Sequence, residues 1–207
     1  MKPFDLDPGQ RIAICGKTGT GKSTLSRRIL AASDYRWFIF NPKRGHTYDR
    51  LPWLSTLTRI NERALRNAIR DKQYVLLNFG SEWDWSDMDD LLGWIIEEYE
   101  DVGVAVDEAY TLHNGGRAGP GVMGLITRGR ELKQSAVFCT QRPSWCTPFI
   151  FSEADYIAEF RLQRRADLKI MEETLGTKAA LQRQVGHDFL YYDVAEERGT
   201  VYKPKAR

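Results

Sequence analysis

The stretch at residues 11–29, RIAICGKTGTGKSTLSRRI, decides how the rest of the sequence is interpreted. Its first five residues are mostly of strand-forming type, and they lead directly into residues 16–23, which match the pattern G-x-x-x-x-G-K-[ST]. Leu25 and Ile29 then recur at helical spacing. A glycine-rich loop between a strand and a helix predicts a P-loop that binds a nucleotide.

Each residue type in this loop has a mechanical role. Glycines let backbone N–H groups converge on a phosphate, which side chains would obstruct. Lys22 supplies a positive charge for the β- and γ-phosphates, and the Ser23 hydroxyl is placed to bind Mg²⁺. The cofactors expected are therefore ATP and Mg²⁺. The residues expected to bind the nucleotide are Gly16, Lys17, Thr18, Gly19, Thr20, Gly21, Lys22, Ser23 and Thr24.

Length and charge set broad limits. The 207 residues fit one domain, with residues 1–10 as an irregular N-terminal arm. The net charge is only +2, but residues 1–80 hold 15 Lys or Arg against 6 Asp or Glu, whereas residues 81–108 hold 11 acids and no base. Such segregation suits head-to-tail subunit contacts or a polarised channel, and separate solvated faces are the simpler alternative.

Several function classes are disfavoured by composition. Three cysteines without C-x-x-C spacing argue against a disulfide framework and a zinc site, and three scattered histidines form no metal-binding pattern. No apolar run approaches membrane-spanning length and no signal peptide opens the chain, so we expect no membrane span and a reducing cytosol.

Predicted strands alternate with predicted helices along the chain. Strands are expected at 11–15, 37–40, 74–79, 102–106, 136–140 and 156–162, and helices from the P-loop to about 32 and at 61–72, 87–100, 121–133, 167–175 and 178–185. Residues 189–194 and 200–203 have the pattern of a terminal β-hairpin. The alternation predicts an α/β fold whose mostly parallel central sheet carries helices on both faces.

A second motif is VGVAVDE at residues 102–108, an apolar strand that ends in two acids. Opposite a P-loop, Asp107 would hold Mg²⁺ and Glu108 would act as general base on the attacking water. A carboxylate that merely caps the next helix is the simpler alternative. The adjacent Glu favours a nucleotide hydrolase over a small-molecule kinase.

A third motif is RGRELKQSAVFCTQRP at residues 128–143. A strand that ends in Gln141 beside the strand of Asp107 would put an amide near the γ-phosphate, where it could sense hydrolysis. From this segment alone, a glutamine that caps a loop is an equal alternative.

These motifs, in this order, resemble the HerA/FtsK superfamily of RecA-like, ring-forming ATPases that pump DNA. The strand at 37–40 followed by Asn41-Pro42-Lys43 is also similar to the D-P-K turn of that superfamily, with Asn in place of Asp. The resemblance covers residues 11–162. Because the chain is nearly bare core, it most resembles the genome-packaging ATPases of tailless, membrane-containing icosahedral viruses.

That resemblance implies an ATP-hydrolysing motor that translocates double-stranded DNA into a preformed capsid. It also implies a homo-oligomeric ring, a hexamer or pentamer, with capsid portal or vertex proteins as partners, working in the host cytoplasm or at the packaging vertex of the virion. Other HerA/FtsK translocases and Zot-like phage assembly ATPases are the nearest alternatives. A P-loop kinase and a nucleotide-gated assembly switch are alternatives from other classes.

The superfamily further implies an arginine finger supplied by a neighbouring subunit. Arg130 matches the G-R position, and Arg128 is the alternative; both are expected near the end of the helix at 121–133, pointing to different sides. A surface arginine that favours the helix dipole is the simpler interpretation. Arg117, in the glycine-rich segment 114–121, is expected to meet DNA phosphate in a ring channel, unless this segment is only a surface loop.

Overall fold

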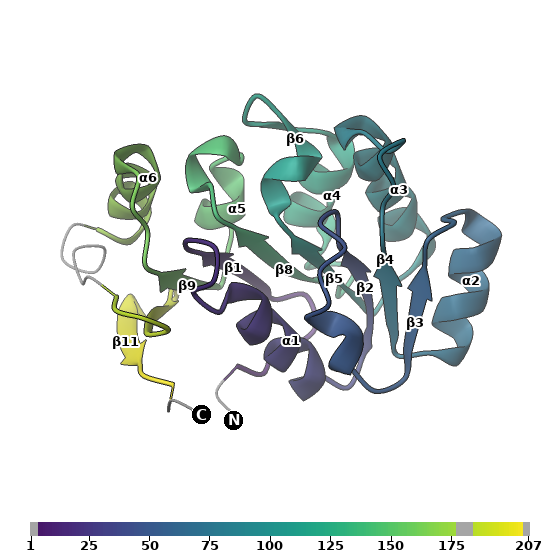
Figure 1. The fold of residues 1–207 in the computed structure, drawn as a ribbon, viewed down its shortest axis with the longest axis horizontal. Coiled ribbons are helices and arrows are strands. Elements are labelled where there is room, and N and C mark those ends of the chain that lie inside the picture. The colour runs from purple at the N-terminus through teal and green to yellow at the C-terminus, as the bar shows by residue number, and fades with distance from the viewer. Residues whose placement is uncertain (1–3, 177–183, 205–207) are drawn as a thin grey trace.

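Figure 1 shows the computed structural model, which describes residues 4–176 and 184–204. Its centre is a nine-stranded sheet with the order β11-β10-β9-β1-β8-β5-β2-β4-β3. The strands of this sheet are β1 (Arg11–Cys15), β2 (Arg36–Phe40), β3 (Leu54–Leu57), β4 (Tyr74–Leu77), β5 (Val102–Asp107), β8 (Ser135–Thr140), β9 (Tyr156–Phe160), β10 (Phe189–Asp193) and β11 (Arg198–Tyr202). The helices are α1 (Lys22–Ala32), α2 (Glu62–Asp71), α3 (Trp85–Glu98), α4 (Pro120–Arg128), α5 (Phe149–Ser152) and α6 (Arg165–Leu175).

All strands from β9 to β3 in this order run parallel, and only β10 and β11 pair antiparallel. The strands at the centre of the sheet are buried along their whole length because both faces are covered. The mostly parallel sheet and the C-terminal hairpin predicted from the sequence are confirmed.

Helices cover both faces of the sheet, and each face has its own apolar core. On one face, α2 to α6 contribute apolar side chains such as Leu65, Leu92 and Met171. On the other face, α1 packs with Leu25 and Ile29. The part of the N-terminal arm that the structure describes lies on the α1 face, where Leu6 belongs to the core and Phe4 contacts the rings of the C-terminal hairpin.

Parallel pairing brings the carboxyl ends of β1, β8 and β5 to one edge of the sheet. The P-loop follows β1, the acidic pair ends β5, and Gln141 follows β8. Loops at the carboxyl ends of adjacent parallel strands are where α/β proteins bind ligands. The topology therefore gathers the three sequence motifs at one place.

The helix predicted at 121–133 ends five residues earlier than expected, since α4 has its last residue at Arg128. The turn that follows it explains the difference. The backbone turns back on itself there, with the Gln134 N–H donating to the Gly129 carbonyl at 2.7 Å, and Lys133 adopts a positive φ of 54°. The buried Gln134 amide then donates to the carbonyls of Ile96 and Tyr99, which fixes the turn beneath α3.

Other boundaries differ as well. The edge strand β3 and the short hairpin β6 (His113–Asn114) and β7 (Arg117–Ala118) were not expected from the sequence, and β9 ends at Phe160 rather than at residue 162. The helix predicted at 178–185 lies largely outside the described residues, and its last two residues, which are described, are not helical. No helix in the described ranges is both long enough and apolar enough to cross a membrane.

Glu159 is a buried carboxyl group in the middle of the sheet. It lies opposite Cys15 in the β1–β9 register, and its Oε2 atom makes no hydrogen bond to any described residue. Burial raises its pKa from an ordinary value of 4.5 to about 8, so the side chain is protonated at neutral pH.

This burial predicts a pH-dependent stability. Between pH 4.5 and 8 the folded state keeps a proton that the unfolded state releases, so the free energy of unfolding falls as the pH rises through that window. Glu159→Gln removes the titration. The melting temperature of the variant should therefore rise relative to wild type between pH 5 and pH 9, whereas exposed Glu131→Gln should show no such trend. A constant difference between Glu159→Gln and wild type at both pH values would contradict this expectation.

Candidate nucleotide-binding site

The P-loop is held against the ends of the neighbouring strands. The Gly16 N–H donates to the Thr140 carbonyl at 3.2 Å, and the Lys17 N–H donates to the Arg161 carbonyl at 2.9 Å. Gly16 has a φ of 152°, and a Cβ at this position would lie 2.5 Å from the Cβ of Phe160. Only glycine therefore fits where the loop leaves β1.

The loop leads directly into α1, as the sequence predicted. Gly21 has a φ of 111° and precedes the first helical residue, Lys22, so the positive end of the helix dipole points into the loop. The Lys22 side chain is buried, and its ammonium donates to the Lys17 carbonyl at 3.2 Å. The ammonium is therefore held inside the ring of the loop, where a phosphate chain would lie.

Ser23 and Asp107, the two expected Mg²⁺ ligands, lie together. The Ser23 hydroxyl donates to Asp107 Oδ1 at 3.0 Å, and Oδ2 lies 3.3 Å away. Burial raises the pKa of Asp107, and the hydrogen bond from Ser23 opposes that rise. A hydroxyl and a carboxylate are the hard oxygen donors that Mg²⁺ takes beside a nucleotide, so these residues fit the ion.

Glu108 occupies a constrained position at the end of β5. It has a φ of 78°, a left-handed conformation that is costly for a side chain other than glycine, and it is only 5% exposed. Its Oε1 atom forms an ion pair with Lys43 at 2.5 Å, and its Oε2 atom makes no hydrogen bond to any described residue. The carboxylate is thus fixed by one oxygen and has the other available as a proton acceptor.

Lys43 is a site residue that the sequence analysis did not identify. It belongs to the turn Asn41-Pro42-Lys43 after β2, in which Asn41 stands in place of the Asp of the D-P-K turn. The Asn41 side chain is fully buried, donates to Gly45 and Asn78, and accepts from the Gly45 N–H. Asn41 therefore shapes the turn, and the turn presents Lys43 to Glu108.

Gln141 lies at the P-loop, since its Oε1 atom accepts a hydrogen bond from the Thr18 hydroxyl. The side chain therefore stands at the end of β8, between the P-loop and the strand of Asp107. This is the side on which a γ-phosphate sensor was expected.

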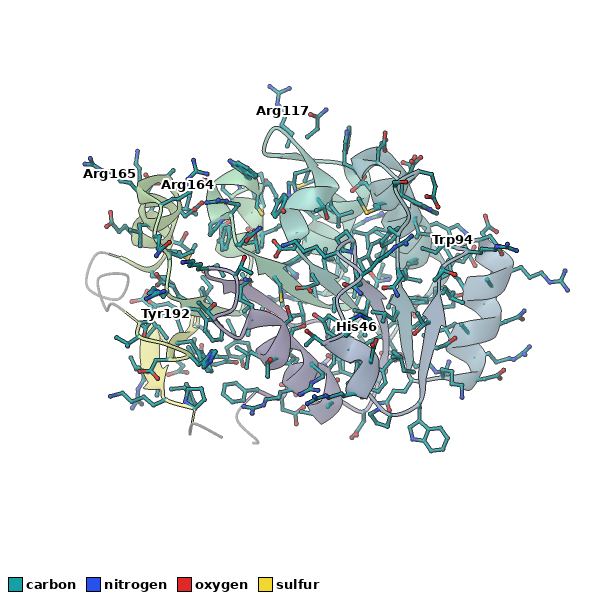
Figure 2. The ribbon with its side chains drawn as sticks, in the orientation of Figure 1. His46, Trp94, Arg117, Arg164, Arg165 and Tyr192 are labelled. Carbon is teal, nitrogen blue, oxygen red and sulfur yellow. The ribbon has the colours of Figure 1, made fainter. Side chains whose placement is uncertain are left out.

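The three arginines considered from the sequence lie elsewhere. Arg130 forms an ion pair with Asp155 at 2.7 Å, beside the amino ends of β1 and β9, and Arg128 pairs with Glu97 at 2.6 Å. Neither lies at the P-loop of its own subunit. The P-loop follows the carboxyl end of β1, whereas both arginines lie near the amino ends of the strands. Since α4 ends at Arg128, the helical geometry expected to relate these two side chains does not apply. Arg117 lies on the β6–β7 hairpin and points away from the molecule in Figure 2.

A cavity of about 760 Å³ adjoins the P-loop on the side of the C-terminal hairpin. Thr20 and Thr24 line it, as do Phe160 and Phe189, whose rings stack with centroids 4.8 Å apart. His187 also lines the cavity, with its Nδ1 atom 3.0 Å from the Thr20 carbonyl oxygen. The size and the mixed lining suit a nucleoside.

Comparisons with known proteins agree with this geometry. No protein-family model matches the chain. The chain is 29% identical over 210 residues to the DNA packaging ATPase P9 of Enterobacteria phage PRD1, an alignment that covers 94% of this chain and 87% of P9.

Two solved structures share the fold over 97% of this chain and all of theirs, each at 20% identity. The genome packaging NTPase B204 from Sulfolobus turreted icosahedral virus 2, in complex with ATP-gammaS, has a TM-score of 0.76. B204, the DNA-packaging ATPase from Sulfolobus Turreted Icosahedral Virus, has a TM-score of 0.75. The predicted fold class and the predicted resemblance to viral DNA-packaging ATPases are confirmed.

Proposed function

We propose that this chain is an ATP-hydrolysing motor that moves double-stranded DNA during viral genome packaging. The observation that carries the proposal is the group formed by Lys22, Asp107, Glu108 and Gln141 at the P-loop edge of the sheet. The similarity to the packaging ATPase P9 over nearly the whole chain supports DNA as the substrate.

The site residues divide the work of hydrolysis. The P-loop N–H groups and Lys22 bind the β- and γ-phosphates, while Gln141 stands at the side where the γ-phosphate would lie. Ser23 and Asp107 would hold Mg²⁺, which neutralises developing charge on the phosphates. The free Oε2 of Glu108 accepts the proton of the attacking water, and Lys43 keeps that carboxylate oriented. The nucleoside lies in the cavity beside Phe160 and Phe189.

We infer a homo-oligomeric ring around the duplex, because one subunit places neither candidate finger arginine near its own nucleotide. Capsid portal or vertex proteins would anchor the ring in the host cell. A small-molecule kinase is the alternative enzyme, and it would need a bound acceptor hydroxyl in place of the attacking water.

Hydrolysis with and without duplex DNA tests this proposal. We expect ATP turnover to rise severalfold when long duplex DNA of mixed sequence is added, in fractions where sedimentation shows an oligomer. A kinase would turn over ATP only with a small acceptor, and an assembly switch would oligomerise with ATP without any response to DNA. Turnover that ignores DNA at every protein concentration would contradict the proposal.

A further inference from the structure

A basic and aromatic surface lies next to the nucleotide site but takes no part in it. At its centre Trp145, which is 49% exposed, ends the short helix η3 (Pro143–Trp145) after β8. The guanidinium carbon of Arg142 lies 5.5 Å from the centroid of the indole ring, and that of Arg164 lies 5.9 Å away. These are cation–π distances, so the ring holds two cations in place.

The loop that carries Trp145 is rigidly attached to α6. Asp167 of α6, only 1% exposed, accepts hydrogen bonds from both the Ser144 N–H and the Ser144 hydroxyl, and it lies 3.6 Å from the Arg142 guanidinium. The Trp145 ring also packs edge-on against Tyr110, with centroids 5.6 Å apart. These contacts hold the exposed tryptophan in a defined position on the surface.

Arg117 and Arg165 add positive charge to the side of the molecule on which Arg164 lies. Arg117, Arg164 and Arg165 are exposed, and none of them forms an ion pair with another described residue, whereas exposed Arg66 and Arg128 do. Figure 2 shows these three arginines along the same edge of the molecule, with Arg117 and Arg165 at its rim. The β6–β7 hairpin, which carries Arg117, lies beside the loop that carries Trp145. The distance shows this, since a Cβ built on Gly116 would lie 4.0 Å from the Trp145 carbonyl oxygen.

We propose that Arg117, Trp145, Arg164 and Arg165, which we call the Trp145 patch, bind the phosphate backbone of duplex DNA. The inference rests on the proposed function and adds the surface that grips the substrate. Exposed arginines without carboxylate partners are suited to phosphate oxygens, and such contacts carry no sequence preference, as a packaging motor requires. The amino end of α6, which starts at Arg165, adds its dipole to the same surface.

The position of the patch connects the DNA to hydrolysis. Gln141, which contacts the P-loop, immediately precedes Arg142 in the chain. Tyr110, which packs on Trp145, follows Glu108 by two residues. A phosphate that shifts the arginines on the Trp145 ring therefore acts on loops that carry both the γ-phosphate sensor and the general base.

Salt-dependent DNA binding tests the patch. The probe is a fluorescently labelled 60-bp duplex of random sequence, titrated with the full chain at several salt concentrations. The double variant Arg164→Ala/Arg165→Ala should bind about tenfold more weakly, and its salt slope should fall by about 2, because two phosphate contacts are lost. The control Arg36→Ala/Arg63→Ala removes the same charge at exposed sites on β2 and α2, and it should stay within about twofold of wild type.

A second pair of variants tests the aromatic centre. Trp145→Phe keeps a ring for the two guanidinium groups, whereas Trp145→Ala removes it, so only Trp145→Ala should lose the stimulation of hydrolysis by DNA. Melting temperatures establish that each variant is folded.

The outcomes separate the two proposals. If wild type binds duplex DNA but Arg164→Ala/Arg165→Ala keeps the affinity and salt slope of the control, the Trp145 patch does not bind DNA. The proposed motor function is then unaffected. If wild type neither binds duplex DNA nor hydrolyses ATP faster in its presence, the proposed function itself is contradicted. Equal DNA stimulation in Trp145→Ala and Trp145→Phe would remove the ring from the coupling.

Discussion

A Glu108→Gln variant is expected to bind ATP with an affinity close to that of wild type and to hydrolyse it about 10²–10⁴-fold more slowly. The amide has the shape of the carboxylate and can still accept the hydrogen bond from Lys43 through its oxygen. It cannot take a proton from water. The loss should therefore fall on turnover, measured as phosphate release at saturating ATP, and not on nucleotide affinity.

The matched control is Glu100→Gln, which makes the same change at an exposed carboxylate just beyond α3. Its turnover should equal that of wild type. If Glu108→Gln kept near-normal turnover, the general base would be another group, and the left-handed backbone and the Lys43 ion pair at Glu108 would need a purely structural explanation.

The second large effect concerns Arg130. We propose that it acts as an arginine finger on the nucleotide of the neighbouring subunit, so Arg130→Ala alone should reduce hydrolysis by roughly 10³–10⁵-fold, equivalent to about 4–7 kcal/mol of barrier. Arg130 is about 60% exposed on its side chain and leaves one ion pair, with Asp155, when it moves to a neighbour. When Arg130 leaves, Asp155, whose side chain is 18% exposed, still accepts a hydrogen bond from the Arg11 N–H at 2.8 Å.

Mixing subunits gives the decisive readout. Lys22→Ala subunits lack a working P-loop but carry an intact Arg130, so adding them to Arg130→Ala subunits should restore part of the hydrolysis. Lys133→Ala, which removes a neighbouring exposed cation, serves as the control and should remain active alone. Absence of rescue at every ratio, in mixtures where sedimentation confirms mixed rings, would exclude Arg130; repeating the series with Arg128→Ala tests the alternative.

The parts of the site that depend on chain order could be predicted from the sequence. A P-loop after one apolar strand and an acidic pair at the end of another lie at the same edge of a parallel sheet, which is why both were expected at one site. In the structure β8 lies between the two strands, and the Ser23 hydroxyl reaches Asp107. Gln141 follows from the same rule. These predictions needed only hydrophobic runs and the polar residues at their ends.

Contacts between distant segments could not be predicted in this way. Lys43 reaches Glu108 across 65 positions, and nothing in its turn shows that its side chain points to β5. Trp145 meets Arg164 only because Asp167 ties the loop after β8 to α6. The end of α4 depends on how the Gln134 side chain is buried under α3, which no local pattern around Arg128 records.

Movement along DNA tests the central claim most directly. The substrate is a long duplex that carries a fluorescent third strand bound in its major groove, and a motor that travels along the duplex displaces that strand. We expect wild type to release the third strand when ATP is present, more slowly as the distance to it grows, and to release none with a non-hydrolysable analogue or with Glu108→Gln. DNA-stimulated hydrolysis without displacement at any distance would contradict a translocating motor.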